Sequence, residues 1–343
     1  MSFVSVLRER EHEYLSPCAC LSENCGGRSH PISECDLRGE FQRDRDRIVH
    51  SKAFRRLMGK TQVFLAPEPD HFRTRLTHTM EVTQIARTIA RALCLNEDLC
   101  EAISLGHDLG HTPFGHAGER VLQKCYDKNF AHYRQSIRVV EVLEPLDLSE
   151  AVLDGIVNHT NGVARTLEGR IVRIADRIAY INHDIDDACR AGILNIGDIP
   201  EHLSDILGDT HGKRIDSMVR SVIRASGEAI ADAEKNGGSG DIVLEPSVSS
   251  AMEELHEFLF ENVYRNPVAK GEEGRASAML EQLYVYFTEH PDELPSEFEV
   301  IKKTESAERA VCDYISGMTD RYAINTFREL FIPEAWKFDK FDG

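Results

Sequence analysis

The chain has 343 residues, of which 41% are hydrophobic and 29% charged; this is enough apolar side chain for a sizeable core and excludes a disordered chain. Its formal net charge of −18 at pH 7 argues against broad, nonspecific binding of nucleic acid. The sequence has no run of about 18 apolar residues and no apolar signal core at its start, so we expect a cytoplasmic protein with no membrane span, whose cysteines are mostly reduced thiols.

The N-terminal arm is polar up to about Asp36, and we expect it to be irregular. It contains a group of thiol and imidazole side chains: Cys18, Cys20, Cys25, His30 and Cys35. Their spacing matches no usual zinc module, which favours free thiols over a second metal site.

The segment that follows, RDRDRIVHSKAFRRLMGK, is strongly basic within an acidic protein. Because Asp44 and Asp46 alternate with its arginines, internal ion pairs are the favoured interpretation. The alternative is that its cations bind a triphosphate or an effector at a subunit interface.

Helical periodicity dominates the rest of the chain. Apolar residues recur at helical spacing in residues 77–95, and Asn96 is a typical N-cap with acidic residues in the turn that follows. The pattern predicts further helices over 130–143, 147–160 and 169–189, a loop over 235–250, and helices again over 250–264 and 307–330. Strand patterns are short and no internal repeat is present, so the sequence predicts an all-α protein.

The stretch SLGHDLGHTPFGH, residues 104–116, carries more imidazole than the end of a helix requires. His78 lies on the apolar stripe of an earlier helix, where a buried histidine needs a polar partner. His107 and Asp108 follow the inward positions of the next helix, and an aspartate is seldom buried without a cation or several donors. Asp176 lies within the apolar run RIVRIADRIAY, which a solvated helix face explains poorly.

These residues form a set of two imidazoles and two carboxylates. For His78 alone, a hydrogen-bonded core histidine is the alternative. Taken together, the set suits a divalent cation such as manganese, iron or zinc, and it leaves coordination positions for water and a substrate.

Five stretches carry a resemblance to a known family: FQRDRDRIVHSKAFRRLMGKTQVF, RTRLTHTMEV, HDLGHTPFGHAGE, RIADRIAYINHDIDDA and VCDYISGMTDRYA, which span Phe41 to Ala323. The chain is similar to the HD-domain phosphohydrolases and, more narrowly, to the bacterial deoxyguanosinetriphosphate triphosphohydrolase-like family, relatives of the vertebrate SAM-and-HD-domain dNTP hydrolase. The resemblance implies an HD-domain helical fold with additional C-terminal helices. It also implies hydrolysis of a deoxynucleoside triphosphate (dNTP) at the α-phosphorus, which gives a deoxynucleoside and tripolyphosphate.

The resemblance implies one divalent metal ion per active site, bound by His78, His107, Asp108 and Asp176. Mn²⁺ is the first expectation, with Mg²⁺, Fe²⁺ or Zn²⁺ as alternatives. The leaving deoxynucleoside alkoxide needs a proton, and a positioned imidazole can supply it.

The implied catalytic residues follow the HD pair. His116 lies eight residues past Asp108, where the family carries its catalytic histidine, and Glu119 orients that imidazole. His111 occupies a position that contacts phosphate or sugar in relatives, and His132 matches another active-site histidine.

The implied substrate-binding residues are Arg75, Arg177, Tyr180 and Asp184. Arg75 precedes His78 by about one helical turn and contacts the triphosphate in the family pattern, with Arg177 as a second candidate. The resemblance assigns Tyr180 and Asp184 to the deoxyribose: the tyrosine ring packs against C2′, and the carboxylate accepts from the 3′-OH.

One position departs from the family pattern. Many relatives read FRRLQ, with a glutamine that hydrogen-bonds the sugar 3′-OH, whereas this chain has Met58 at that place. Methionine cannot make those hydrogen bonds, so we expect the sugar site to differ there.

We expect three parts: an N-terminal arm over residues 1–40, an HD-domain catalytic core over 41–234, and a C-terminal helical region over 235–343 that packs on the core. Relatives form dimers, tetramers or hexamers, so a homo-oligomer is expected, and a dNTP effector would be a further ligand. The runner-up function is an HD phosphohydrolase acting on another nucleotide, and a third is a nucleotide- or nucleic-acid-sensing module with vestigial catalysis. The stripe YINHD favours the dNTP hydrolase over the runner-up, and intact His116 and Glu119 beside the metal set disfavour the sensing module.

Overall fold

The computed structural model describes residues 2–62 and 73–333, with the side chains of 267–271 excepted. Within these ranges the regular structure is helical, and the one strand-like feature is an isolated antiparallel bridge between Thr61 and Thr74. The all-α prediction is therefore confirmed. Among the described helices, none combines the length and the apolar composition that crossing a membrane requires.

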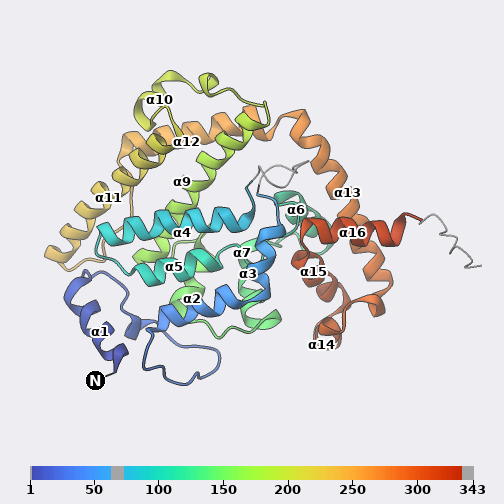
Figure 1. Ribbon diagram of the computed structural model, residues 1–343, viewed down its shortest axis with the longest axis horizontal. Coiled ribbons are helices and arrows are strands. Elements are labelled where there is room, and N and C mark those ends of the chain that lie inside the picture. Colours follow the sequence, from blue (N-terminus) through green and yellow to red (C-terminus); the bar gives the residue numbers. More distant parts are fainter. Residues whose placement is uncertain (1, 63–72, 334–343) are drawn as a thin grey trace, which may run out of the picture.

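The centre of the molecule is a set of helices arranged around α9. They are α2 (Glu40–His50), α3 (Lys52–Arg56), α4 (Arg75–Ala92), α5 (Glu97–Gly106), α8 (Glu150–Asn158) and α9 (Leu167–Arg190). Helix α4 packs against both α5 and α9, and α2 packs against α5 (Figure 1). Asn96 caps α5 as predicted, because its side chain accepts from the backbone N–H groups of Asp98 and Leu99.

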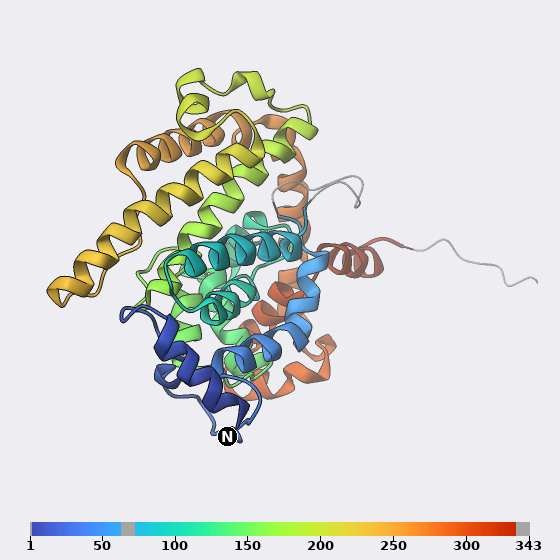
Figure 2. The ribbon, with the colours of Figure 1, turned by 60° about the vertical axis from the view of Figure 1, so that its left-hand side comes forward.

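The remaining helices surround this centre. They are α1 (Phe3–Tyr14), α6 (His116–Cys125), α7 (His132–Arg138), α10 (Glu201–Leu207), α11 (His211–Asn236), α12 (Pro246–Leu259), α13 (Pro267–Glu289), α14 (Glu299–Thr304), α15 (Ala307–Gly317) and α16 (Asp320–Phe331). Single π-helical turns, Val139–Leu143 and Phe260–Tyr264, extend α7 and α12. Helices α10–α12 form one flank of the molecule and α13–α16 another, as both views show (Figure 2).

Two hydrophobic clusters hold these helices together. The larger includes Val82, Ile103, Ile178 and Leu255, and the smaller joins α6 to the C-terminal helices through residues such as Leu122, Leu280 and Val311. Each fully buried aliphatic side chain contributes about 1.5–3 kcal/mol to folding. Leu109 belongs to the larger cluster and Phe114 to the smaller, so the turn between His107 and His116 packs against both.

Three sequence-based boundaries were wrong. The N-terminal arm is not irregular throughout: α1 forms there, capped by Ser2, whose hydroxyl accepts from the Ser5 N–H at 3.3 Å. The expected loop at 235–250 is shorter, because α11 continues to Asn236 and α12 begins at Pro246. Proline is favoured at the first position of a helix, and Gly237 adopts the left-handed conformation (φ +76°) that ends α11.

The third boundary concerns the helix expected over 307–330. It is interrupted at Met318, and α16 starts afresh after Thr319, whose hydroxyl accepts from the Tyr322 N–H at 3.2 Å. This new N-terminus matters for the site, because it places Asp320 beside the histidine-bearing turn.

The basic segment forms one of the internal ion pairs that were predicted, because Arg45 pairs with Asp46 at 2.7 Å. Asp46 also pairs with Arg38 at 2.7 Å, and buried Asp44 pairs with Arg28, so both aspartates of the segment bind arginines of the N-terminal arm as well.

Candidate metal centre and active site

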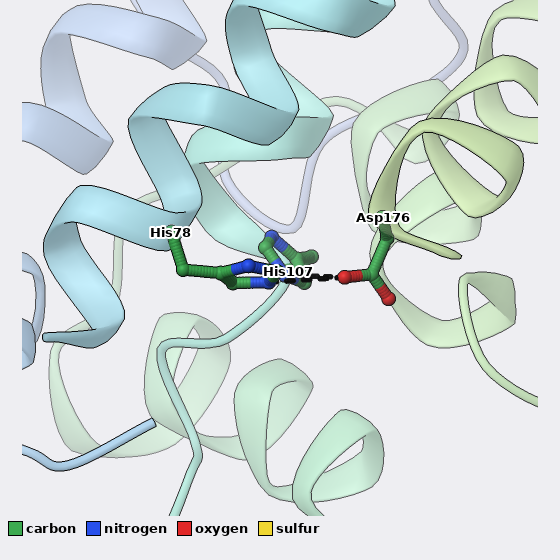
Figure 3. Close-up of side chains that lie close together, drawn as sticks. All are labelled: His78, His107 and Asp176. Carbon is green, nitrogen blue, oxygen red and sulfur yellow. Dashed lines mark ion pairs between the residues drawn. The ribbon is translucent and has the colours of Figure 1, made fainter. Parts of the chain in front are cut away.

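Three separate elements bring His78, His107 and Asp176 together. His78 comes from α4, His107 from the residue that follows α5, and Asp176 from the middle of α9, and Figure 3 shows the side chains pointing toward one another. Nε2 of His78 lies 3.0 Å from Oδ1 of Asp176, and Nε2 of His107 lies 3.9 Å from the same oxygen. Atoms that share an ion at about 2.1 Å are about 3.0 Å apart at right angles and about 4.2 Å apart when opposite. The three donors therefore have the spacing of ligands to a single cation.

The orientation of His107 provides the clearest sign of a missing partner. Its Nδ1 donates to the Ser104 carbonyl at 2.6 Å, so the neutral ring carries a lone pair on Nε2. That Nε2 is buried and has no hydrogen-bond partner among the described residues. A buried acceptor facing carboxylate oxygens needs a cation or a donor between them.

Asp108 lies beside this group. Its Oδ1 is 3.6 Å from Nε2 of His107, and its Oδ2 accepts from Arg75 at 2.7 Å. Burial alone would raise the pKa of Asp108, but the charges of His107, in its protonated form, and of Arg75 hold it well below its usual value. Likewise, burial would raise the pKa of Asp176, but a hydrogen bond from His78 and the charge of His107 in its protonated form hold it at about 2. Both carboxylates are therefore ionised, as metal ligands must be.

The structure thus brings three of the four predicted ligands into one group and places Asp108 in a second group, with His107 common to both. One group is His78, His107 and Asp176; the other is His107, Asp108 and His159. The predicted use of Arg75 has to be restated, because its guanidinium is already bound to Asp108.

A second set of imidazoles lies next to this centre. The rings of His111 and His132 are stacked, with centroids 4.5 Å apart. Glu119 joins His132 to His116: its two carboxylate oxygens accept from Nδ1 of His132 and Nδ1 of His116, each at 3.2 Å. These contacts hold the pKa of Glu119 far below its ordinary value despite burial. Glu119 therefore carries a negative charge between two imidazoles.

His116 differs from its neighbours in exposure. Its side chain is 69% exposed, whereas His111 and His132 are buried. A cavity of about 360 Å³, whose lining includes His116 and His132, opens to solvent beside it. Burial lowers the pKa of His111 well below its ordinary value, so that ring is neutral at physiological pH. His116 is therefore the imidazole of this set that can most easily exchange a proton with solvent.

His159 belongs to the site and was missed in the sequence. It follows α8, donates from Nδ1 to the Ile156 carbonyl at 2.7 Å, and packs its ring 4.9 Å from that of His107. Its Nε2 lies 3.3 Å from Nε2 of His132. Burial lowers the pKa of His159 to about 3, so its ring is neutral and its Nε2 carries a lone pair. The sequence NHT at the end of a predicted helix was the available signal.

The turn before His116 is held from outside the HD region. Phe114 (φ +58°) and Gly115 (φ +57°) both have left-handed backbone, which is unfavourable for phenylalanine. Oδ1 of Asp320 accepts from the Phe114 N–H at 2.9 Å, and Oδ2 of Asp320 accepts from the Thr61 N–H at 2.9 Å. Asp320 thereby fixes the conformation that brings the chain back to His116.

Lys60 adds a second link to the same turn. Its buried ammonium donates to the carbonyls of His111 and Ser316, the latter at 2.8 Å, so it connects the histidine turn to α15. Burial lowers the pKa of Lys60 to about 7. Neither Lys60 nor Asp320 stood out in the sequence, because each acts through residues far away in the chain.

The predicted sugar residues lie along α9 and face α12 and the π-helical turn that follows it. The Tyr180 hydroxyl is 3.2 Å from Nδ1 of His256 on α12. Asp184 is buried, and its Oδ2 accepts a hydrogen bond from the Tyr264 hydroxyl, while its Oδ1 has no partner among the described residues. Burial and nearby Asp187 raise the pKa of Asp184 well above its usual value. Tyr264 was also missed in the sequence, since nothing local distinguished it from a core tyrosine.

Arg177 lies beside this row, half-buried and in contact with Tyr180. Met58, the departure from the family pattern, is 67% exposed in the 3-10 turn Leu57–Gly59. Four residues further on, Gln62 has a buried amide oxygen without a partner among the described residues. Its backbone lies close to Gly115, so Gln62 is a further polar residue near the site that sequence reasoning missed.

The cysteine group of the N-terminal arm lies apart from these ligands. Cys18, Cys20 and Cys25 pack against the larger hydrophobic cluster. In the described part of the chain, the groups of side chains with metal-ligand spacing contain none of the cysteines.

Comparison with known proteins places the chain in a family. Residues 75–181 match the HD domain, and residues 242–329 match the phosphohydrolase-associated domain. A protein of Caldanaerobacter subterraneus subsp. tengcongensis, named deoxyguanosinetriphosphate triphosphohydrolase-like protein, is 53% identical over 98% of both chains. A protein of Desulfatibacillum aliphaticivorans with the same name is 46% identical over 97% of this chain and 99% of its own.

Among solved structures, a hypothetical protein from Aquifex aeolicus matches with a TM-score of 0.47 and 22% identity, covering 83% of this chain and 69% of that one. The curated relatives match nearly end to end, which is far more than the HD motif alone would give. From the matches to these relatives, we conclude that the chain belongs to the deoxyguanosinetriphosphate triphosphohydrolase-like family of HD-domain proteins.

Proposed function

We propose that the protein hydrolyses deoxynucleoside triphosphates at the α-phosphorus, giving a deoxynucleoside and tripolyphosphate, and that it requires one divalent cation. The observation that carries the proposal is the buried Nε2 of His107, which has no hydrogen-bond partner in the part of the chain that the structure describes and which faces Asp108 and Asp176. The family name of the relatives supports dGTP as a substrate, and the site does not distinguish among the bases.

His78, His107, Asp108 and Asp176 would hold the cation. Two imidazoles and two carboxylates suit Mn²⁺ first, with Mg²⁺, Fe²⁺ or Zn²⁺ as alternatives. When bound, such an ion stabilises negative charge on phosphate oxygens and orients the substrate. Arg75, bound to Asp108 at its NH1 group, fixes that carboxylate and keeps its other nitrogens for a phosphate.

Proton transfer is the task of the second set of imidazoles. We assign the general acid to His116, which would protonate the leaving 5′-oxygen. Glu119 orients its ring by accepting from Nδ1, which leaves Nε2 to face the substrate. The rings of His111 and His132 stack on each other beside it, and His111 would donate to or accept from a phosphate or the sugar.

Substrate recognition would fall on the polar side of α9. Asp184 has a buried carboxylate oxygen, without a partner among the described residues, that would accept from the 3′-OH, and Tyr264 fixes the other oxygen. The Tyr180 ring would lie against C2′ and so disfavour a ribose hydroxyl. Arg177 would add a cation for the triphosphate. The division into an arm, a core and a C-terminal region, the homo-oligomer, the dNTP effector and the cytoplasmic location stay predictions.

The test is to load the full-length protein with Mn²⁺ and incubate it with each dNTP singly and in pairs. Ion-exchange chromatography then separates the products. We expect tripolyphosphate and a deoxynucleoside, with no product in excess chelator. Hydrolysis of monophosphates or cyclic nucleotides instead would favour another phosphohydrolase class, and nucleotide binding without turnover would favour a sensing module.

A further inference from the structure

Two residues outside the ligand set, His183 and Glu81, form a chain of contacts that ends on His78. His183 lies on α9, two turns after Asp176, and is buried, while Glu81 lies on α4, one turn after His78. Nδ1 of His183 is 3.4 Å from Nδ1 of His78, and Nε2 of His183 contacts the Glu81 carboxylate. The contacts therefore run from α4 to α9 and back to α4.

The contacts favour one arrangement of the protons. A carboxylate only accepts, so the close contact of Nε2 with Glu81 favours the neutral His183 ring that carries its proton on Nε2. Nδ1 of His183 is then an acceptor, and His78 must donate to it from its own Nδ1. The remaining nitrogen of His78, Nε2, is left with a lone pair at 3.0 Å from Asp176.

This order of protons matters because His78 has a competing arrangement. With no acceptor at Nδ1, the ring could carry its proton on Nε2 and donate it to Asp176, and that hydrogen bond would close the position to a cation. With the acceptor present, Nε2 of His78, Nε2 of His107 and Oδ1 of Asp176 all present lone pairs to the same space. We propose that Glu81 and His183 are positioning residues that hold His78 in the tautomer that binds the metal ion.

The contacts from Glu81 through His183 to His78 form a relay, and further contacts fix its outer end at Glu81. Nε of Arg73 lies 3.4 Å from the Glu81 carboxylate, and its NH1 group binds Asp186 and Asp187 at 3.0 and 3.2 Å. The ring of His211 stacks on that of His183 with centroids 6.4 Å apart. The relay is therefore fixed in place by neighbours on α9 and α11 as well as by α4.

The inference rests on the proposed metal site, and its test measures metal affinity separately from turnover. The metal-stripped, full-length protein is titrated with Mn²⁺, and the paramagnetic resonance signal of free Mn²⁺ gives the Kd. His183→Phe keeps a ring but removes both nitrogens, and Glu81→Gln removes the charge that selects the tautomer. The matched control is His202→Phe, because His202 forms an exposed pair with Glu254 at 2.8 Å between α10 and α12.

We expect His183→Phe to raise the Kd for Mn²⁺ by about 10–100-fold and Glu81→Gln by about 10-fold, the usual range for groups that orient a metal-bound histidine. The double variant should be no worse than His183→Phe, since the residues act in series. Saturating Mn²⁺ should restore most of kcat, and His202→Phe should match the wild type.

In other metal sites, removing a group that orients a metal-bound histidine weakens metal binding by about 10–100-fold. A Kd for Mn²⁺ within about twofold of the wild type in both variants would therefore overturn the relay. Effects of the two substitutions that add in full would also contradict it. If His183→Phe does not fold by circular dichroism, Glu81→Gln decides the question alone. A wild-type protein that binds no divalent cation would instead overturn the proposed function, and the relay with it.

Discussion

Oε2 of Glu119 lies 3.2 Å from Nδ1 of His116, and the other oxygen of the same carboxylate binds His132. One buried negative charge therefore orients both an exposed and a buried imidazole. This pairing gives His116 a fixed direction even though most of its side chain is exposed to solvent.

We expect His116→Ala to keep metal and dNTP binding but to lower kcat by about 10²–10⁴-fold, the usual share of general acid–base catalysis. Glu119→Gln should have a smaller effect, because an amide can still accept from His116. Single-turnover kinetics at saturating dGTP, with metal content measured on the same samples, check this. A His116→Ala variant that turns over at the wild-type rate would move the acid to another residue, with His111 the next to test.

The role proposed for Tyr180 and Asp184 on α9 predicts a partial preference for a deoxyribose over a ribose. A ring packed near C2′ rejects an added hydroxyl only modestly, by about 10²-fold in comparable pockets. Tyr180→Ala should therefore narrow the gap in kcat/KM between dGTP and GTP. Asp184→Asn should raise KM for dNTPs while leaving metal content unchanged. Equal kcat/KM for dGTP and GTP in the wild type would remove the steric role of Tyr180.

Asp320 links the helices α13–α16 to the turn before His116. Asp320→Ala removes the acceptor for the N–H of Phe114, which has left-handed backbone, and should release the turn before His116. We expect a loss of kcat of about 10-fold or more with little change in Mn²⁺ affinity, since small displacements of catalytic groups are costly. Asp313→Ala is a useful comparison, because it removes a buried carboxylate of α15, in the same flank as Asp320, that pairs with Arg138 on α7. Equal losses of kcat in both variants would point to general destabilisation.

Glu168 predicts a pH dependence of stability. Its Oε1 accepts from the backbone N–H groups of Cys20 and Asn96, while its buried Oε2 has no partner among the described residues. Burial raises the pKa of Glu168 to about 7. The folded state therefore binds a proton that the unfolded chain releases above its ordinary pKa, so this contribution is present at low pH and is lost as pH rises through about 7.

We expect Glu168→Gln to flatten this dependence and to stabilise the protein at pH 8 relative to the wild type by up to about 3 kcal/mol. Denaturant unfolding at pH 6 and pH 8 measures it. The same difference between the two pH values in wild type and variant would show that Glu168 is not the group responsible.

The four expected metal ligands could be predicted from the sequence because each is a polar residue at or next to positions where helical periodicity places apolar residues. His78 and Asp176 stand at inward positions of apolar helices, and His107–Asp108 follows an inward stripe. The helices themselves could be predicted because their apolar residues recur at helical spacing. The first helix gave no such signal, because α1 has no buried residue and is held by its cap and by Glu11, which binds Ser22 and Asn96.

The supporting residues could not be predicted, because their partners are distant in the chain. Asp320 accepts a hydrogen bond from the Phe114 N–H, and Tyr264 donates one to Asp184. Each of these contacts forms only once the helices have packed. In the sequence, His183 was just one polar residue on the stripe of α9. Its contact with His78 depends on how α4 crosses α9.

The most direct test of the account is hydrolysis of dGTP in ¹⁸O-labelled water by the Mn²⁺-loaded protein, with mass spectrometry of both products. Asp176→Ala, which lacks a proposed metal ligand, serves as the inactive control. Attack of water at the α-phosphorus predicts one ¹⁸O atom in tripolyphosphate and unlabelled deoxyguanosine. Formation of dGMP and pyrophosphate, label in the deoxyguanosine, or full activity in Asp176→Ala would contradict it.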